Sequence, residues 1–150
     1  MLAIRACLAA AISLGINLAI AKKTTTHLRP VAVVEDDSRV REAIRDLLSS
    51  AELRSQAFRT AEGFLRSKSL RRFACLVVDA QLPGMGGSAL CEHLSSRGIA
   101  IPTIVISADE EGRRRLSTGR SSQRLVAVFA KPFDGREFLR AVRAALRSAR

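Results

Sequence analysis

The sequence has few of the residues that build disulfide frameworks or zinc sites. It contains three cysteines, Cys7, Cys75 and Cys91, and two histidines, His27 and His93. The cysteines are odd in number and form no Cys-x-x-Cys pair, and the histidines lack metal-ligand spacing. We therefore expect a chain that folds without disulfides or zinc, as is usual in a reducing compartment.

Aromatic and acidic residues are also scarce. The chain has no Trp or Tyr, and its 25 Lys and Arg outnumber 14 Asp and Glu, which gives a formal net charge of +11. Such a charge attracts acidic partners. Direct binding to nucleic acid is not expected, because the sequence has no recognition-helix signature and no Tyr or Trp for base stacking.

The length and the remaining composition indicate one folded domain with a real core. The chain has 150 residues, of which 47% are hydrophobic and 26% charged, values that exclude general disorder. From Pro30 onward, short apolar runs alternate with segments of helical periodicity, a pattern typical of βαβ units. The sequence thus predicts an α/β fold, a doubly wound parallel sheet made of five strand-then-helix repeats.

The expected elements can be placed along the chain. The strands are predicted at Val31–Val34, Leu53–Phe58, Cys75–Val78, Ile101–Ile106 and Leu125–Phe129. Helices are predicted at Ser38–Ser50, at Ala61–Ser67, at Ser88–Ser96, in the segment Asp109–Gln123, and from Asp134, which with Glu137 resembles a capping box. The helix in Asp109–Gln123 should be short or mobile, because it contains two glycines and few apolar anchors.

Residues 1–29 form a different segment, which we separate from a domain at 30–150. The segment has an apolar run from Ala6 to Ala21, followed by Lys22 and Lys23. Three interpretations stay open: a membrane anchor that keeps the domain on the cytoplasmic side, a cleaved signal peptide, and a translated upstream region without fixed structure. Membrane contact is expected only through this segment.

Polar residues follow four of the five predicted strands. Glu35, Asp36 and Asp37 follow the first, Asp79 the third, Ser107 the fourth and Lys131 the fifth. The carboxyl ends of parallel strands meet at one edge, where ligands bind in such sheets. A carboxylate nucleophile at Asp79, acids that hold Mg²⁺, and Ser107 and Lys131 facing phosphoryl oxygens would suit phosphoryl transfer to a carboxylate.

Four motifs in this order resemble the receiver domain of bacterial two-component response regulators. They are Val-Val-Glu-Asp-Asp at 33–37, Val-Val-Asp-Ala-Gln-Leu-Pro-Gly-Met-Gly-Gly at 77–87, Ile-Ser-Ala at 106–108 and Lys-Pro-Phe at 131–133. The segment 58–67 is similar to the branch that includes the nitrogen-fixation regulators. The resemblance implies a flavodoxin-like fold with strand order 2-1-3-4-5.

The resemblance also implies roles for individual residues. Asp79 is the expected phosphoacceptor, with Ser107 and Lys131 beside it, and a cis peptide bond is expected between Lys131 and Pro132. The expected Mg²⁺ ligands are carboxylates and one backbone carbonyl, contributed by Glu35, Asp36, Asp79 and Gln81 (the carbonyl). Glycines at 84, 86 and 87 should let the loop after Asp79 turn sharply.

One position departs from the family. Three residues before the lysine, where the family usually has Phe or Tyr, the chain has Val128, with Phe129 next to it. This difference implies that the readout of phosphorylation differs. The arginines at 136, 140, 143 and 147 fall on one face of the last predicted helix, and are either a docking face for an acidic partner or an ordinary solvated face.

We therefore expect a cytoplasmic, stand-alone receiver in a phosphorelay. It would accept a phosphoryl group from a histidine kinase or histidine phosphotransfer protein and would dock on a downstream target. It would catalyse at most its own phosphorylation. The alternative is a phosphorylation-independent interaction module with the same fold. A phosphatase is disfavoured, because the second carboxylate that those enzymes need is replaced by Gln81.

Overall fold

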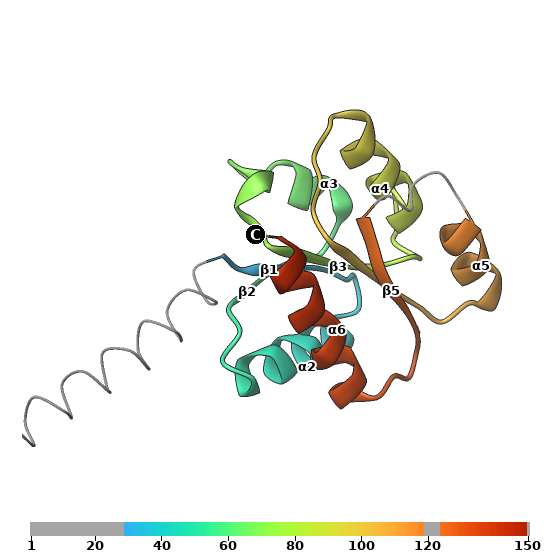
Figure 1. Cartoon of the computed structure of the whole chain (residues 1–150). Helices are drawn as coiled ribbons and strands as arrows, with labels where there is room; N and C mark the ends of the chain where they lie inside the picture. The colour runs from blue at the N-terminus through green and yellow to red at the C-terminus, as the bar shows by residue number, and fades with distance from the viewer. Residues whose placement is uncertain (1–28, 119–123, 150) are drawn as a thin grey trace, which may run out of the picture.

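Five short segments, four of them mainly apolar, form the strands of a parallel sheet. The computed structural model describes residues 29–118 and 124–149. The strands are β1 (Val31–Val34), β2 (Ser55–Phe58), β3 (Cys75–Asp79), β4 (Thr103–Ser107) and β5 (Leu125–Ala130). They pair in the order β2-β1-β3-β4-β5 (Figure 1). The predicted doubly wound sheet is confirmed. Strands β1, β3 and β4 are buried along their whole length, as expected for central strands covered on both faces.

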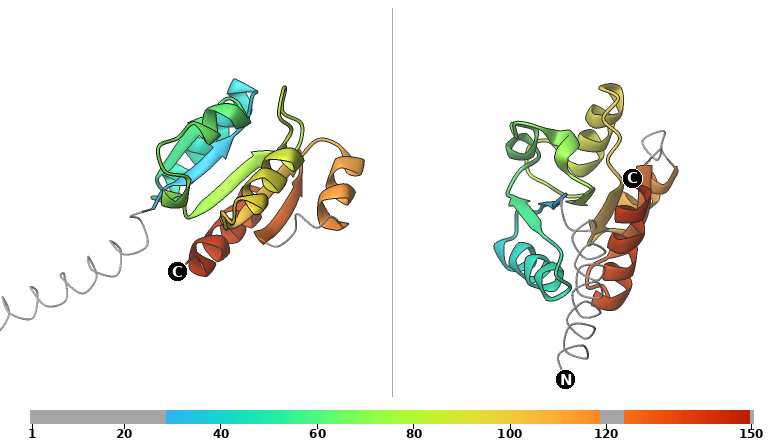
Figure 2. Two further views of the ribbon diagram at one scale, coloured as in Figure 1. Left: turned by 90° about the horizontal axis from the view of Figure 1, so that it is seen from above. Right: turned by 60° about the vertical axis from the view of Figure 1, so that its left-hand side comes forward.

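Helices cover both faces of this sheet. They are α2 (Ser38–Ser50), α3 (Ala61–Leu65), α4 (Gly87–Ser96), α5 (Glu110–Thr118) and α6 (Gly135–Ser148), with a 3₁₀ turn, η1 (Leu70–Arg72), before β3. Helices α2 and α6 lie on one face and α3 and α4 on the other, whereas α5 contacts β4 and β5 at the edge (Figures 1 and 2). Of the segment Asp109–Gln123, the nine residues Glu110–Thr118 form α5, and residues 119–123 lie outside the described ones.

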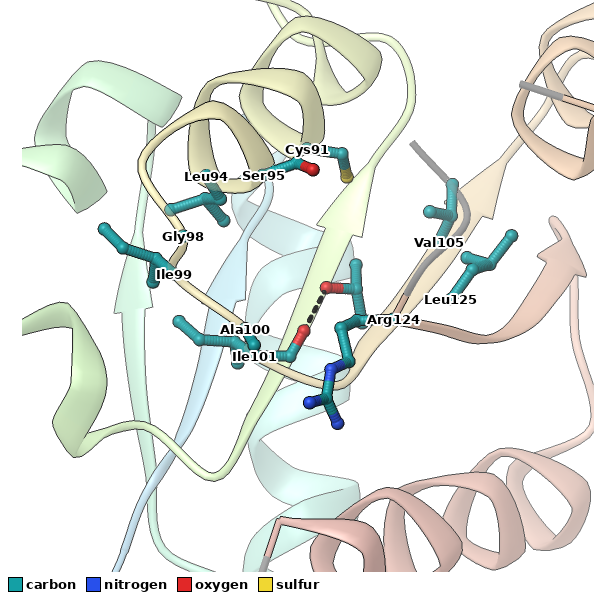
Figure 3. A pocket seen from close by; sticks show the side chains of 11 residues that line it. Cys91, Leu94, Ser95, Gly98, Ile99, Ala100, Ile101, Val105, Arg124 and Leu125 are labelled. Atoms are coloured by element: carbon teal, nitrogen blue, oxygen red, sulfur yellow. Dashed lines mark hydrogen bonds between the residues drawn. The ribbon is translucent and has the colours of Figure 1, made fainter. Parts of the chain in front are cut away.

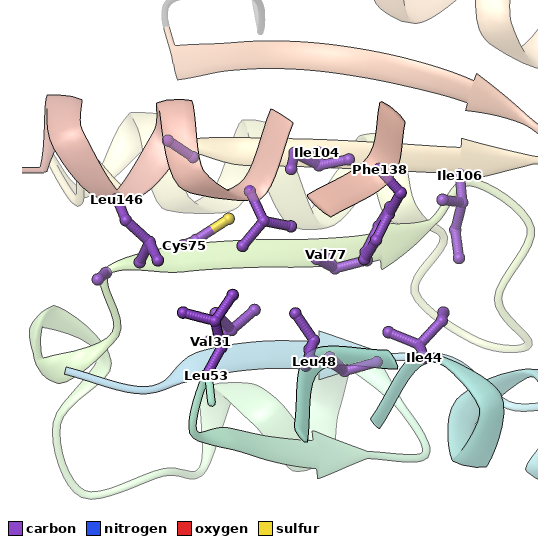
Figure 4. Packing of buried hydrophobic residues seen from close by; sticks show 14 residues of the cluster. Val31, Ile44, Leu48, Leu53, Cys75, Val77, Ile104, Ile106, Phe138 and Leu146 are labelled. Carbon is purple, nitrogen blue, oxygen red and sulfur yellow. The ribbon is translucent and has the colours of Figure 1, made fainter. Parts of the chain in front are cut away.

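The alternation of side chains along the strands divides the core into two halves. Val31 and Val33 of β1 pack with Ile44 of α2 and Phe138 of α6, as Figure 4 shows for Val31, Ile44 and Phe138. The residues between and after them, Ala32 and Val34, face the opposite side, where α3 and α4 pack. Because successive strand residues point to opposite faces, one apolar run supplies both halves.

Aspartates begin two of the helices that surround the sheet edge. The carboxylate of Asp37 accepts hydrogen bonds from the backbone N–H groups of Arg39 and Val40, and so begins α2. Asp134 accepts from the N–H groups of Arg136 and Glu137 in the same way at α6. These four hydrogen bonds satisfy N–H groups that have no partner inside the helix.

Several predicted boundaries differ from the structure. β2 and β4 begin two residues later than predicted, although Leu53 and Ile101, which lead into them, are buried. The predicted segments are longer than the strands because Leu53 and Ile101 pack on the core without being part of a strand. Helix α3 ends at Leu65 rather than Ser67, and η1 was not predicted.

Arg29 belongs to the folded part of the chain. Its guanidinium donates hydrogen bonds to the carbonyls of Arg71 and Phe73 before β3 and of Ala149 after α6, at 2.8 to 2.9 Å. The three interpretations of the N-terminal segment concern residues that lie outside the described ones. Within 29–118 and 124–149, no helix has both the length and the apolar character that a bilayer crossing requires.

Candidate functional site

The structure brings the predicted polar residues together at the carboxyl edge of the sheet. The Lys131 ammonium donates hydrogen bonds to Asp79 Oδ2 at 2.6 Å and to Glu35 Oε2 at 2.8 Å. Glu35 and Asp79 follow or end neighbouring strands, β1 and β3, and Lys131 reaches them from the end of β5. The spatial grouping inferred from strand ends is thus present.

Three carboxylates form a compact acidic group. Glu35, Asp36 and Asp79 each place a carboxylate oxygen within 4.8 Å of the others. Glu35 is fully buried, Asp79 is buried and Asp36 is partly exposed. Carboxylates this close repel one another unless a cation lies among them, and a hard divalent cation prefers oxygen ligands of this kind. The donor set fits Mg²⁺.

The electrostatics of Glu35 and Lys131 reflect this crowding. Burial raises the pKa of Glu35, and this effect exceeds the opposing effect of its hydrogen bonds from Lys131 and the Asp37 backbone. Partial burial would lower the pKa of Lys131, but its bonds to Asp79 and Glu35 raise that pKa overall. The lysine is therefore held as a cation beside a carboxylate whose ionised form is disfavoured.

Asp79 is fixed through both of its carboxylate oxygens. Oδ1 accepts a hydrogen bond from the backbone N–H of Gln81 at 2.8 Å, while Oδ2 accepts from Lys131. Gln81 thus lies beside Asp79 through its backbone. That its carbonyl is a metal ligand stays a prediction.

Ser107 lies at the end of β4 and is fully buried. Its hydroxyl donates to the carbonyl of Asp109 and accepts from the N–H of the same residue, both at 3.0 Å. The backbone carbonyl of Ser107 accepts from the N–H of Lys131 at 2.9 Å. The next peptide bond, between Lys131 and Pro132, is cis, which confirms the expectation.

The loop after Asp79 requires glycine at two positions. Gly84 has φ of 75°, and a Cβ on Gly87 would come within 2.4 Å of the Asp79 carbonyl oxygen. The N-terminus of α4 can therefore approach the backbone of Asp79 only with glycine at position 87. Gly86 has ordinary extended angles, so the same expectation for that position was wrong.

Two residues that support the site were not predicted from the sequence. Arg41 of α2 donates to the carbonyls of Glu35 and Asp36 at 2.9 and 3.1 Å, and so holds the acidic turn. Glu62 of α3 accepts a hydrogen bond from the Met85 N–H at 2.8 Å, which ties the loop after Asp79 to α3. Arg41 could have been suspected, because it is one turn into a helix that begins directly after the acids. Glu62 gave no such signal.

Val128 and Phe129 point to opposite faces of the sheet. Val128 packs with the half of the core beneath α3 and α4, whereas Phe129 packs with Phe133 and Phe138 on the α6 side. Phe129 is therefore packed, partly buried, against the α6 half of the core and does not take the place of the aromatic residue that the family has at the position of Val128.

A separate cavity lies away from the acidic group. It has a volume of about 170 Å³ and is lined by residues of α4, the segment before β4 and the start of β5, including Cys91, Ile99 and Arg124 (Figure 3). None of the site residues described above lines it. Burial raises the pKa of the Cys91 thiol to about 11, and of the Cys75 thiol to about 12, so neither provides a nucleophile at neutral pH.

Comparison with known proteins agrees with the fold and the motifs. The family model of the response regulator receiver domain matches residues 31–143. The response regulator protein TmoT of Ectopseudomonas mendocina is 32% identical over 119 residues, 79% of this chain and 53% of that protein. The transcriptional regulatory protein FixJ of Azorhizobium caulinodans is 34% identical over 117 residues, 78% of this chain and 54% of that protein.

Solved structures show the same similarity. The crystal structure of FixJ-N has a TM-score of 0.70 at 26% identity, covering 79% of this chain and 94% of that one. The structure of the response regulator StyR has a TM-score of 0.71 at 31% identity, covering 81% of this chain and 61% of that one. The FixJ matches agree with the branch predicted from segment 58–67. The chain spans about half the length of the curated relatives it matches.

Proposed function

Because this chain belongs to the response regulator receiver family of two-component systems, we propose that Asp79 accepts a phosphoryl group from a phosphohistidine. Receivers of this family take part in phosphorelay signalling and receive phosphoryl groups from histidine kinases. The observation that carries the proposal is the Asp79 carboxylate, held between the Lys131 ammonium and the Gln81 N–H beside two further acids.

The proposed reaction is a transfer between two side chains. A carboxylate oxygen of Asp79 forms a bond to phosphorus while the bond between phosphorus and the donor histidine nitrogen breaks, and the product is an aspartyl phosphate. Lys131 stabilises one phosphoryl oxygen by its positive charge. The Ser107 hydroxyl gives up its hydrogen bond to the Asp109 carbonyl and donates to another phosphoryl oxygen. Mg²⁺ held by Glu35, Asp36, Asp79 and the Gln81 carbonyl would supply further positive charge to the phosphoryl oxygens.

The proposed output is a change in surface docking on a downstream protein. We propose that the donor is a histidine kinase or a histidine phosphotransfer protein, and that the domain acts in the cytoplasm, where ATP phosphorylates such donors. The stand-alone arrangement stays a prediction, and so does the absence of direct binding to nucleic acid, since the relatives include transcriptional regulators about twice as long as the matched part.

The experiment is intact-mass analysis of the full chain after treatment with acetyl phosphate. We expect one phosphoryl adduct that forms with Mg²⁺ and is absent when EDTA replaces it. The variant Asp79→Asn should give none. Asp37→Asn is a matched control, because it removes a neighbouring carboxylate while asparagine still caps α2, and it should keep the adduct.

The second candidate function is a phosphorylation-independent interaction module. It is favoured by Val128, which leaves the domain without the aromatic residue through which the family reads out phosphorylation. A folded wild-type chain with no adduct under any of these conditions would support this function, and an adduct that persists in Asp79→Asn would contradict Asp79 as the acceptor.

A further inference from the structure

An arginine precedes every strand of the sheet. The segments that lead into β1 to β5 contain, in chain order, Arg29, Arg54, Arg71 with Arg72, Arg97 and Arg124. The segment before β3 also holds Arg66 and Lys68. Among the described residues of these segments, the one acid is Glu52. We call the surface that they form the amino-terminal face.

Contacts between these segments show that they lie together. Arg29, before β1, donates to the carbonyls of Arg71 and Phe73, before β3. Arg71 donates in turn to the carbonyl of Gly98, before β4, and the Arg54 carbonyl accepts from the N–H of Val31. A depression lined by Arg29, Arg54 and Arg72 lies among them. The arginines thus spread over one end of the sheet, whose five strands span roughly 19 Å at about 4.8 Å between neighbours.

We propose that the amino-terminal face docks on an anionic lipid surface. The attraction is Coulombic, so a guanidinium that is hydrogen-bonded to a backbone carbonyl still contributes its charge. The face extends across all five strand starts, which suits an extended charged plane better than a small ligand. It is also at the opposite end of the sheet from Asp79, so docking would leave the phosphoacceptor accessible.

The sequence next to this face favours a membrane over an acidic protein. The chain enters the face at Arg29, directly after residues 1–28, whose sequence contains the apolar run from Ala6 to Ala21 and then Lys22 and Lys23. An apolar segment combined with a basic cluster is the pairing of signals that stable attachment to an anionic membrane requires. The proposal adds a contact through the folded domain to the one that residues 1–29 would make under the membrane-anchor interpretation.

The test is sedimentation of the full chain with vesicles at physiological ionic strength. One set of vesicles contains phosphatidylcholine alone and the other also contains phosphatidylglycerol. The ratio of the two affinities isolates the electrostatic part of the binding free energy, because any apolar contribution of residues 1–28 is common to both sets of vesicles. We expect clear preference for the anionic vesicles and its loss as salt is raised.

Two variants of equal net charge locate the contact. Arg72→Glu/Arg97→Glu/Arg124→Glu should weaken binding to anionic vesicles by roughly 100-fold or more, since each basic residue near the surface contributes about fivefold. Arg39→Glu/Arg136→Glu/Arg140→Glu changes exposed arginines in the first two turns of α2 and α6, which begin at the carboxyl end of the sheet. It should change binding by only about threefold, because charges beyond a Debye length of about 8 Å are screened.

Thermal melting of both variants shows whether they are folded. Equal binding to neutral and anionic vesicles would overturn the proposal, and so would equal losses in the two variants. Tighter binding to duplex DNA than to anionic vesicles, at the same ionic strength, would also overturn it and would indicate a nucleic-acid surface. Acetyl phosphate should still modify vesicle-bound protein, because the acidic end faces away from the membrane.

Discussion

The two ends of the sheet carry opposite charge and use it differently. The carboxyl end gathers Glu35, Asp36 and Asp79, which repel one another and depend on Lys131 and a further cation for compensation. The amino-terminal face gathers arginines, but Arg29 and Arg71 donate hydrogen bonds to backbone carbonyls of segments far away in the sequence. We propose that the charge at the first end serves phosphoryl transfer, whereas the hydrogen-bonded arginines at the second end tie segments of the fold together.

The largest expected effect on stability comes from removing the cation of the acidic end. Lys131→Met leaves the buried Glu35 without its partner and should lower the free energy of unfolding in EDTA by about 2–3 kcal/mol, somewhat less than for a wholly buried pair. Mg²⁺ should then stabilise the variant more than the wild type, because the ion replaces the lost charge. Urea titrations with and without Mg²⁺ measure both.

Lys68→Met is the matched control at the other end of the sheet. Lys68 is exposed, and its substitution should change stability by less than about 0.5 kcal/mol with no altered response to Mg²⁺. Equal stability of Lys131→Met and wild type in EDTA would show that the acidic end is not under electrostatic strain.

The second prediction concerns pH. Burial raises the pKa of Glu35 above its ordinary 4.5, so its proton competes with Mg²⁺ at higher pH than for an exposed acid. Mg²⁺ affinity should fall about tenfold per pH unit below that pKa. Protonation of Glu35 does not destabilise the fold, because a raised folded pKa means that the folded state binds the proton more tightly than the unfolded state.

The cap carboxylates behave in the opposite way. Hydrogen bonds from backbone N–H groups lower the pKa of Asp37 and Asp134 below the ordinary 3.8. Their stabilising contribution is present above pH 3.8 and is lost as pH falls through the lowered values. On acidification, calorimetry should therefore show the Mg²⁺ response disappearing before the protein unfolds, and simultaneous loss would contradict the assignment.

A smaller effect is expected at the amino-terminal end. Arg29→Met removes the hydrogen bonds to Arg71, Phe73 and Ala149 and should lower the free energy of unfolding by about 1–2 kcal/mol. Formation of the phosphoryl adduct in the folded variant should be unchanged. Arg143→Met, on the exposed flank of α6, is the control and should be nearly neutral; if the two variants melt alike, Arg29 does not tie the chain ends together.

The smallest effect is expected at Glu62, which orders the loop after Asp79. Glu62→Ala removes the acceptor for the Met85 N–H and should weaken Mg²⁺ binding about threefold, the contribution of a modest hydrogen bond. Glu62→Gln keeps an acceptor oxygen and should bind Mg²⁺ like the wild type. Isothermal titration of both variants measures the difference, and identical affinities would mean that the loop is held without this bond.

The acidic end was largely predictable, whereas the contacts that Arg29 makes at the amino-terminal face were not. Asp79, Ser107 and Lys131 are recognisable because each directly follows or ends a strand run, and a parallel sheet places such positions at one edge. The contacts of Arg29 join residues separated by 42 to 120 positions. No local periodicity encodes these contacts. From the sequence alone, Arg29 therefore cannot be distinguished from an arginine that is exposed on the surface.

The sequence by itself determined the succession of strands and helices along the chain, the two-sided core and the edge at which the acids meet. These features follow from the spacing of apolar residues and from the geometry of parallel strands. Only the tertiary structure decided which charges compensate one another. Lys131 bridges Asp79 and Glu35, Arg41 and Glu62 hold the flanking loops, and Arg29 binds the carbonyls of Phe73 and Ala149. These contacts depend on the distances between segments that the packed helices set.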